Sequence, residues 1–382
     1  MVERKKVLML LSNPFRPDPR VHREALSLVK AGYHVTIICW DRGLSLPREK
    51  VIDGIKIIRV GPASDWGNAR NMVKNLPKFW KNLRRTADGL DYGIVHAHDL
   101  DTLSPGLKLA SRKKIPIIYD GHEIYHEMAG ENLSPFLVKF VAWYERRMMR
   151  KPDIVLTVNE PIAKLFRGYG AKDVREIMNC QSDAGVDPSR VDELRKVMSP
   201  GGKGTALYIG VLEPNRLLLE LAKAHSAGEE DFILVLGGFG SLEGQLKTIA
   251  DKSNGRVAFI GKVHPKDVPA YTRAANVLLA TYDPKLRNNR IGAPNKLFES
   301  MIASRPIIVS KGTYAADVAE KTGCGLPSEY TSDSVLSAVS RLLSDSELYK
   351  KCAESGRKAY EEKYNWAVME ARLLEAYSKL LN

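Results

Sequence analysis

A predicted helix in the second half of the chain begins with residues suited to bind an anion. Residues 287–310 read RNNRIGAPNKLFESMIASRPIIVS, where apolar residues recur at helical spacing and the last five residues form a predicted buried strand. Pro294 suits the first helical position, since its missing N–H costs nothing there. Free N–H groups and the dipole at such a helix start attract anions. In the plainer interpretation, Glu299 is a solvated residue that pairs with Lys296 for about 0.2–0.5 kcal/mol.

Histidines and aspartates follow a predicted strand in GIVHAHDLDTLSPG. His96 and His98 share one face of the strand, because successive side chains alternate. An imidazole such as His98 at a strand tip can contact a sugar or an acceptor hydroxyl. Asp99-Leu-Asp101 also spells a DXD sequence, which holds a divalent metal in some transferases. We do not predict a metal here, because Asp101 falls near a helix start, where a carboxylate caps free N–H groups.

The next predicted strand ends in IPIIYDGHEIYHEM, which contains a literal H-E-x-x-H. In zinc proteases this motif needs two histidines on one face of a long helix and a further ligand. Here His122 and Glu123 directly follow a strand, in a predicted loop, so we do not predict a zinc enzyme.

Two predicted helix starts carry cations. Asp18, Arg20, His22 and Arg23 crowd the first one. The two arginines oppose the helix dipole there, so we expect a bound anion or a nearby carboxylate. Arg216 follows a predicted strand in YIGVLEPNRLLLEL. It is either a phosphate clamp or a solvated cation.

The glycines of FILVLGGFGSLEGQL superficially match a dinucleotide-binding fingerprint. The last glycine, Gly244, comes one position late, and no acidic residue ends a following strand at the expected distance. We therefore predict a tight strand-to-helix turn at Gly238, and not a dehydrogenase.

Short apolar runs alternate with amphipathic segments in two series, which predicts parallel sheets with crossover helices. The predicted strands are KVLMLL, HVTIICW, IKIIRV, GIVHAHD, IPIIYD, DIVLTVN and VREIMNC, and then ALYIG, FILVLGG, VAFIGK, VLLATY and PIIVS. A loop-like stretch, 181–203, separates the series. We expect an α/β fold of two doubly wound, Rossmann-like domains, residues 1–185 and 186–364. We also expect a ligand cleft between them, and a final helix, 365–382, that returns to the first domain.

The composition is typical of a soluble globular protein, with 44% apolar and 27% charged residues, and the 382-residue length favours two domains. We expect a cytoplasmic location, because we find no signal peptide, no membrane-spanning stretch and four widely spaced cysteines.

A net charge of +13 is the one unusual feature of the composition. Nucleic acid is not an expected partner, because no nucleic-acid-binding motif is present. The basic segment 69–88 is either a docked helix with a solvated face or a contact with the inner face of an anionic membrane, through cations and an aromatic wedge.

Several of these segments together resemble the GT-B-fold retaining glycosyltransferases of family four, the glycosyl transferases group 1. The resemblance covers nearly the whole chain and includes DPRVHREALSLVKAGYHVTII, DYGIVHAHDLDTLSPGL, IPIIYDGHE, ERRMMRKPDIVLTVNE, FILVLGGFG, VAFIGKV and, most specifically, PNKLFESMIASRPIIVS. The family has two glutamates in an E-x7-E motif. Glu299 matches the second glutamate, whereas Ile291 stands at the position of the first, as in some members with the PNKLFE version.

The resemblance implies a role for each part of the nucleotide site. Glu299 receives the ribose hydroxyls, and the N–H groups around Gly292 and Ala293 face the diphosphate. Val211 stands where the family has an arginine on the diphosphate, and Arg216 lies near the position of the family's lysine.

The resemblance also assigns the remaining site residues. Arg290 or Lys296 is a candidate replacement for the missing cation, the base lies against the loop at Lys262 and Val263, and His98 matches a histidine near the reacting sugar. The full expected site is His98, Arg216 and Lys296 for catalysis, Glu299, Gly292, Ala293, Asn295, Arg290, Gly238, Lys262 and Val263 for the donor, and Arg20, His22, His122 and Glu123 for the acceptor.

The implied reaction is retaining, metal-independent transfer from a UDP- or GDP-linked sugar to a hydroxyl of a glycan or lipid-linked acceptor, with no further cofactor. Two alternatives remain open. One is a sugar-nucleotide 2-epimerase of the same fold, and the other is a non-catalytic two-lobed sugar-binding protein.

Overall fold

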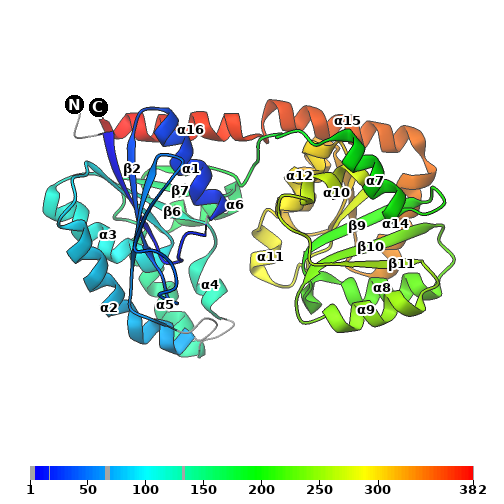
Figure 1. Ribbon diagram of the computed structural model, residues 1–382, viewed down its shortest axis with the longest axis horizontal. Helices are drawn as coiled ribbons and strands as arrows, with labels where there is room; N and C mark the ends of the chain where they lie inside the picture. Colours follow the sequence, from blue (N-terminus) through cyan, green and yellow to red (C-terminus); the bar gives the residue numbers. More distant parts are fainter. Residues whose placement is uncertain (1–4, 17, 65–68, 131–133, 382) are drawn as a thin grey trace. The chain divides into compact units, whose positions relative to one another are not determined.

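The computed structural model describes residues 5–16, 18–64, 69–130 and 134–381, without the side chains of 69, 70, 129 and 130. The chain forms two compact units (Figure 1). Unit 1 comprises Met1–Met178 with Ala367–Asn382, and unit 2 comprises Asn179–Trp366. Each unit is a doubly wound α/β domain with one main sheet. Among the residues that the structure describes, no helix is both long and apolar enough to cross a bilayer.

Unit 1 is built on an eight-stranded sheet with the order β3-β4-β2-β1-β5-β6-β7-β8. All neighbouring strands are parallel except the β3–β4 hairpin. Its strands are β1 (Lys6–Leu11), β2 (His34–Trp40), β3 (Glu49–Ile52), β4 (Ile55–Val60), β5 (Ile94–His98), β6 (Ile117–Gly121), β7 (Ile154–Thr157) and β8 (Val174–Glu176). Every residue of β5, β6 and β7 is buried, as expected where helices cover both faces of a parallel sheet.

The helices of unit 1 lie on both sides of this sheet. They are α1 (Pro19–Lys30), α2 (Ala69–Ala87), α3 (Leu100–Lys113), α4 (Tyr125–Gly130), α5 (Pro135–Met148), α6 (Glu160–Gly168) and α16 (Trp366–Leu381). Figure 1 shows α2, α3 and α5 on one side and α1 and α16 on the other. Helix α3 packs against both α2 and α5, so these three form one layer.

Unit 2 is built on a six-stranded parallel sheet with the order β11-β10-β9-β12-β13-β14. Its strands are β9 (Gly204–Val211), β10 (Phe232–Phe239), β11 (Val257–Gly261), β12 (Val277–Ala280), β13 (Ile307–Ser310) and β14 (Gly325–Ser328). Its helices are α7 (Pro188–Met198), a 3₁₀ helix η2 (Pro214–Arg216), α8 (Leu218–Ala227), α9 (Glu243–Lys252), α10 (Val268–Ala274), α11 (Arg287–Ile291), α12 (Asn295–Ala303), α13 (Tyr314–Thr322), α14 (Ser332–Ser344) and α15 (Ser346–Glu362).

Several elements were not expected from the sequence, among them helix α4, which places His126 in a helix rather than in the expected loop, helix α7 and strands β3 and β14. The stretch expected to be a loop, 181–203, contains helix α7, which Asp187 caps by accepting from the N–H of Ser189, with Pro188 at the first position. Strands β3 and β14 were also missed. Their sequences, EKVI and GLPS, lack both the continuous apolar run and the clean apolar–polar alternation that reveal a strand.

Helix α2 corrects part of the expectation for the basic segment 69–88. The helix runs through Pro77 without a break. Its aromatic residues do not form an exposed wedge, because Phe79 is buried and stacks on Trp40 with ring centroids 4.6 Å apart. Trp80 donates its ring N–H to the carbonyl oxygen of Asp101 at 2.6 Å. The described surface of α2 is therefore mainly cationic, with Val73 as an exposed apolar side chain and no exposed aromatic wedge.

Helix α16 is fastened to unit 1 by buried contacts. Tyr377 is fully buried, and its hydroxyl lies 2.8 Å from Nδ1 of His96 on β5. The N–H of Met178 donates to Sδ of Met369 at 3.2 Å. Two surface ion pairs, Arg175–Glu375 and Lys379–Asp173, add to these contacts at 3.0 and 2.9 Å.

The Tyr377–His96 hydrogen bond gives a stability prediction. We expect Tyr377→Phe to lower the free energy of local opening of α16 and β5 by about 1–3 kcal/mol, because a buried imidazole nitrogen loses its partner. Hydrogen exchange followed by mass spectrometry measures this for peptides from both elements. Tyr271→Phe in unit 2 is the control, since the Tyr271 hydroxyl makes no hydrogen bond to a described residue. Equal protection in wild type and Tyr377→Phe would contradict the prediction.

Candidate functional site

Two groups of polar side chains gather at the carboxyl edges of the two sheets, one group in each unit. Such edges are where doubly wound sheets bind ligands. In unit 1 we call the group the His/Asp cluster, which consists of Arg20, Glu24, His96, His98, Asp99, Asp120 and His122. In unit 2 we call the group the two-cation site, which consists of Lys296, Arg216 and the residues that hold them.

Arg20 organises the His/Asp cluster. It is buried in the first turn of α1, where its Nε and Nη2 donate to the two carboxylate oxygens of Asp120 at 2.9 and 2.7 Å. Its Nη1 donates to the carbonyl oxygen of Ile177 at 2.7 Å, and its Nε lies 3.2 Å from Oε1 of Glu24. A buried arginine with such partners is a fixed charge. The carboxylate expected beside this helix start is therefore present.

Asp120 and Asp99 hold His122 between them. Nε2 of His122 lies 2.9 Å from Oδ2 of Asp120, and Nδ1 lies 3.5 Å from Oδ2 of Asp99. Burial lowers the pKa of His122, but the charges of Asp99 and Asp120 outweigh it and raise this pKa to about 10. His122 is therefore an imidazolium at neutral pH.

Asp99 has a backbone conformation that is nearly reserved for glycine, with φ 62° and ψ 163°. Such strain costs on the order of 1–3 kcal/mol and is found mainly at functional sites. The Asp99 N–H donates to the carbonyl oxygen of Asp120 at 3.0 Å, and its own carbonyl accepts from Thr102 at 3.2 Å. These bonds hold the strained residue and leave its carboxylate free to face His122.

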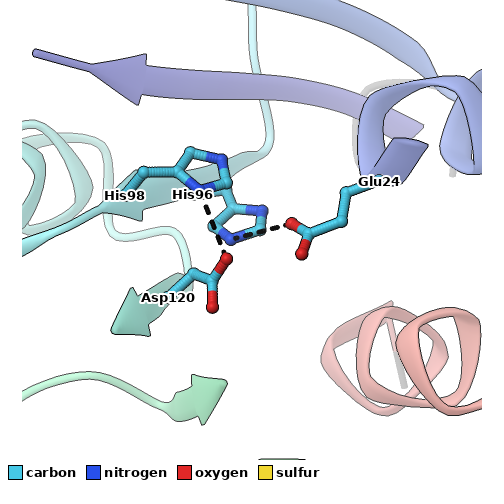
Figure 2. A group of neighbouring side chains, drawn as sticks. All are labelled: Glu24, His96, His98 and Asp120. Atoms are coloured by element: carbon cyan, nitrogen blue, oxygen red, sulfur yellow. Dashed lines mark ion pairs between the residues drawn. The ribbon is translucent and has the colours of Figure 1, made fainter. Parts of the chain in front are cut away.

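The remaining members of the cluster are buried beneath this edge (Figure 2). His96 and His98 stack with ring centroids 4.3 Å apart, as their shared strand face predicted. Nδ1 of His98 lies 3.3 Å from Oδ2 of Asp120, and Nε2 of His96 lies 4.0 Å from Oε2 of Glu24. Nε2 of each histidine is buried without a hydrogen-bond partner among the described residues. His98 is fully buried in this conformation.

The electrostatics of the buried part follow from Arg20 and from burial. The pKa of Asp120 is held well below its usual range, because the charges of Arg20 and His122 outweigh burial. Burial, and then the charge of Asp120, raises the pKa of Glu24 to about 7. Burial holds the pKa of His96 well below its usual value, so His96 is neutral.

These residues fit a metal ion poorly, although they include common ligand types. Glu24, His96, His98 and Asp120 offer ligand atoms that all lie within 4.8 Å of one another. However, the Arg20 guanidinium already occupies both oxygens of Asp120 and contacts Glu24. A divalent cation here would lie beside a permanent positive charge and would have to displace it.

The two histidines of the H-E-x-x-H sequence contact different residues, and so do the two aspartates of the DXD sequence. Helix α4 begins only at Tyr125, so His122 and His126 do not share a helix, and His126 Nδ1 lies 2.5 Å from Glu145. In the DXD sequence, Asp99 faces His122, whereas Asp101 is buried in α3, where burial and the charge of Asp99 raise its pKa to about 7.

Two further expected acceptor-side residues are His22 and Glu123. Nε2 of His22 pairs with Oδ2 of Asp53 in the β3–β4 turn at 2.8 Å. Glu123 is exposed in the loop before α4. The structure therefore brings Arg20 and His122 together with His98, but not His22.

In unit 2, Lys296 is held between two aromatic rings. Its Nζ lies 4.4 Å from the ring centroid of Tyr208 and 5.9 Å from that of Tyr282. A Cβ on Gly210 would come within 2.7 Å of this Nζ, so the glycine makes room for the ammonium group. Burial lowers the pKa of Lys296, but Tyr282, Tyr208 and Glu299 outweigh it and raise the pKa. Lys296 is therefore charged.

Arg216 lies against the same tyrosine. Its guanidinium carbon is 4.0 Å from the ring centroid of Tyr282, and Nη1 donates to Oδ1 of Asn289 at 2.8 Å. The hydroxyl of Thr281 donates to the carbonyl oxygen of Arg216 at 2.7 Å. These contacts join η2 to the segment between β12 and α12, so that both cations are held by one local structure.

Neither cation of this site forms a close ion pair with a carboxylate of a described residue, although the charge of Glu299 acts on Lys296 from a longer distance. Within the described part of the chain, neither Lys296 nor Arg216 has an acidic oxygen within 4.0 Å. The ion pair that the plainer interpretation of Lys296 and Glu299 requires is therefore absent. Partly buried cations without anionic partners are costly unless an anion binds them. The two-cation site is thus suited to a phosphate group.

Glu299 lies one turn into α12, whose first residue is Asn295, with Pro294 as the preceding cap rather than the first helical residue. Burial raises the pKa of Glu299, and Lys296 and a hydrogen bond with Gln181 counteract this rise. The expected anion-facing amides need one correction. The N–H of Gly292 is not available, because it donates to the carbonyl oxygen of Asn288 at 2.8 Å. The N–H of Ala293 has no such bond to a described residue.

The glycines after β10 form a tight turn, as expected. A Cβ on Gly238 would come within 1.7 Å of the carbonyl oxygen of Gly210 on the neighbouring strand β9, and its φ is +137°. The turn presents Phe239, which is 52% exposed, with Nζ of Lys262 5.2 Å from its ring centroid. Val211 is also exposed at this edge, as are Arg290 and Asn295 near α12.

Several residues that shape the two groups were not predicted from the sequence. They are Tyr208, Tyr282, Asn289 and Phe239 in unit 2, and Glu24 and Tyr377 in unit 1. Glu24 had a usable signal, because it lies four positions after Arg20 on one helix face. The tyrosines had none, since their partners lie on other elements.

Comparison with known protein families supports these observations. Residues 20–181 match the family model described as Glycosyltransferase Family 4, and residues 203–345 match the one described as Glycosyl transferases group 1. An uncharacterized glycosyltransferase of Methanocaldococcus jannaschii is 22% identical over a 381-residue alignment, and the match covers 91% of this chain and 90% of that protein.

Solved structures with the same fold cover nearly the whole chain. Sucrose-phosphate synthase from Thermosynechococcus elongatus has a TM-score of 0.80 at 16% identity, over 98% of this chain and 99% of that one. HepE from Anabaena, solved with UDP-glucose, has a TM-score of 0.72 at 15% identity, over 98% and 99% of the two chains. At such identities the likeness shows the GT-B fold.

The His/Asp cluster gives a prediction for pH. Because the folded-state pKa of His122 is raised from 6.5 to about 10, its ion pairs stabilise unit 1 fully below pH 6.5, and this stability is lost as the pH rises through about 10. In an NMR titration, we expect the His122 imidazole to stay protonated at pH 8, and Asp99→Asn to lower its pKa. Asp53→Asn, which removes the partner of His22, should leave His122 unchanged. Titration of wild-type His122 near 6.5 would refute the assignment.

Proposed function

Since this chain belongs to the family 4, group 1 glycosyltransferases and takes its sugar from a nucleotide sugar, we propose that its two-cation site binds the diphosphate of the donor. Family membership makes glycosyl transfer the reaction, in place of the 2-epimerase and the non-catalytic binding protein. The observation that carries the proposal is that Lys296 and Arg216 are held side by side on Tyr282 without a carboxylate partner.

The surrounding residues support a pose for the rest of the nucleotide. We assign the ribose hydroxyls to Glu299, one turn into α12 beyond the cations. We assign the base to the edge formed by Phe239, Lys262 and Val263, because an exposed aromatic ring there can stack on a base. HepE, a structural relative, was solved with UDP and with UDP-glucose, and UDP is our first candidate donor nucleotide.

The same geometry supports a role in catalysis. As the sugar leaves, negative charge grows on the diphosphate, and two prearranged cations stabilise that charge without reorganising. The Ala293 N–H and the start of α12 add donors to the same region. Retention of configuration would follow attack from the leaving-group face, with the donor phosphate taking the acceptor proton. This step needs no protein nucleophile.

We place the acceptor at the carboxyl edge of unit 1. His122 and the strained Asp99 are the partly exposed polar groups of the His/Asp cluster, with 21% and 31% of their side chains exposed. Arg20 acts through Asp120 as a positioning residue, and His98 lies beneath His122. His22 and Glu123 remain proposed acceptor-side residues, although His22 pairs with Asp53 outside the cluster. We infer that the acceptor is a hydroxyl-bearing glycan or lipid-linked precursor.

Donor binding is tested by comparing two variants with two ligands. We expect UDP to raise the free energy of unfolding of the wild type by about 2.7 kcal/mol at a hundredfold excess over Kd, and to raise its melting temperature accordingly. Lys296→Met should weaken UDP binding about 10- to 150-fold and bring it close to that of uridine, since only the diphosphate contacts Lys296. Glu299→Ala should weaken the binding of both UDP and uridine, because both ligands carry the ribose.

The control for donor binding is Glu220→Ala, an exposed residue of α8 in the same unit. This variant should bind both ligands as the wild type does. If UDP and GDP both fail to stabilise the wild type, the assignment of the two-cation site is wrong. Equal losses of UDP and uridine binding in Lys296→Met would place the lysine elsewhere on the nucleotide.

The metal-independent reaction is tested by chelation. We expect EDTA to leave the transfer rate and UDP affinity unchanged, because fixed cations replace the metal at the diphosphate and Arg20 occupies Asp120. Steady-state rates are measured with and without EDTA, and then with added Mg²⁺ or Mn²⁺. A rate that EDTA abolishes and a divalent metal restores would overturn this part of the proposal.

A further inference from the structure

Helix α5 carries a largely exposed apolar face, judged on the residues of unit 1 that the structure describes. The exposed fractions are 78% for Phe136, 45% for Leu137, 55% for Phe140 and 57% for Trp143. The rings of Phe140 and Trp143 lie 5.8 Å apart and form one surface. Scattered exposed apolar residues are ordinary, but such a concentration of aromatic side chains on one helix marks an interaction site.

The opposite side of α5 anchors the helix. Glu145 and Met148 are buried, and the Glu145 carboxylate accepts from the N–H of Tyr125 and pairs with His126. Phe136, Phe140 and Trp143 are spaced four and three positions apart, so they share one face of the helix. The exposed face is therefore held outward by the packing of the other face.

The charge around this apolar face has one sign. The exposed charged residues of α5 are Lys139, Arg146 and Arg147, and its one acidic residue, Glu145, is buried. Helix α3, which packs beside α5, adds exposed Lys108. Beyond it, the described side chains of α2 include five cations and no acidic residue, namely Lys74, Lys78, Lys81, Arg84 and Arg85. Helices α2, α3 and α5 lie in one layer (Figure 1), their exposed charged residues named here are all cations, and α5 adds the exposed aromatic residues.

We propose that the exposed face of α5 inserts into the interfacial region of an anionic lipid bilayer, with the cations of α5 and α2 on the lipid headgroups. Aromatic and aliphatic side chains beside lysine and arginine are the composition of helices that lie in a membrane interface. Each nearby cation adds attraction to anionic lipid. From the sequence both the cations and the aromatic wedge are expected on residues 69–88, but in the structure α2 supplies mainly cations, and α5 supplies the exposed aromatic residues.

A second copy of this chain fits the face less well. Pairing two α5 faces would bury the aromatic patch but would bring Lys139, Arg146 and Arg147 of both copies together, with no exposed acidic residue on the helix to neutralise them. Like charges at an interface oppose association. An anionic bilayer satisfies the apolar residues and the cations at once.

Vesicle binding tests the proposal. We expect the wild type to sediment with phosphatidylcholine vesicles that contain phosphatidylglycerol, more weakly with phosphatidylcholine alone, and less at high salt. A variant with Phe136→Ser, Phe140→Ser and Trp143→Ser should lose binding by on the order of a hundredfold or more, because each buried aromatic side chain contributes about tenfold. The control is Val51→Ser with Val197→Ser, which removes two side chains that are each 68% exposed elsewhere.

The contribution of charge is tested with a matched pair of variants. Lys139→Glu with Arg147→Glu should weaken binding to anionic vesicles, by about fivefold or more per residue. Lys247→Glu with Lys252→Glu, exposed residues of α9 in unit 2, changes the net charge equally and should have little effect. Arg146 is left in place because it stacks over Tyr169 at 5.1 Å.

A spectroscopic measurement keeps the test valid if the triple variant misfolds. In the wild type, brominated lipids should quench tryptophan fluorescence, and Trp143→Phe should bind the vesicles but lose most of that quenching. Persistent vesicle binding by a folded triple variant would overturn the proposal. The proposal would also be overturned if the wild type did not bind vesicles but formed a dimer, and if the triple substitution disrupted that dimer. UDP stabilisation, measured in parallel, is independent of these outcomes and reports on the proposed function alone.

Discussion

The buried ion pair between Arg20 and Asp120 determines the arrangement of unit 1. Because both carboxylate oxygens accept from the guanidinium, Asp120 stays ionised in the interior, and an ionised Asp120 in turn keeps His122 protonated. Arg20 also contacts Glu24, which faces His96, and His96 is hydrogen bonded to Tyr377 of the last helix. The carboxyl edge of β5 and β6, helix α1 and helix α16 are therefore coupled through one charge pair. Removing either partner would leave an uncompensated buried charge, which is far more costly than losing a surface pair.

The two-cation site follows the opposite rule. Unit 1 neutralises its buried arginine with carboxylates, whereas unit 2 holds Lys296 and Arg216 on tyrosine rings and an asparagine. Aromatic rings and amide oxygens hold a cation in position without cancelling its charge. A site built in this way keeps its attraction for a phosphate group. This contrast explains why the same residue type, a helix-start arginine, is a positioning residue in one unit and a proposed ligand-binding residue in the other.

Charge is also distributed unevenly over the surface. The net charge of +13 includes the cations of α2, α3 and α5, which lie on one side of the sheet of unit 1 and have few acidic neighbours. The helix face on which an aromatic residue lies decides whether its side chain packs in the core or is exposed. Phe79 of α2 faces the sheet and stacks on Trp40, whereas Phe140 and Trp143 of α5 face outward. The composition of the helices is similar, but their orientation makes one an ordinary docked helix and the other a candidate interface.

Local sequence patterns were sufficient to predict most of the fold and to identify the family. Apolar runs identified twelve of the strands, glycine and proline marked the turns, and the PNKLFES segment placed Glu299 and Lys296 at a helix start. Those features depend on neighbouring residues, because hydrophobic periodicity and turn chemistry are local. The hairpin strand β3, the edge strand β14 and helix α7 were missed where that local signal was weak.

The partners of the functional residues depended on the tertiary structure. Arg20 and Asp120 are 100 positions apart, and His96 and Tyr377 are 281 positions apart. The two tyrosines around Lys296, and the loss of the Gly292 N–H to Asn288, likewise follow from which strands and loops become neighbours. The sequence determined which residues could carry charge and bind a nucleotide sugar. Strand order and helix packing decided which charges are cancelled, which remain available and which aromatic side chains face solvent, because those outcomes depend on contacts between elements that are distant in the chain.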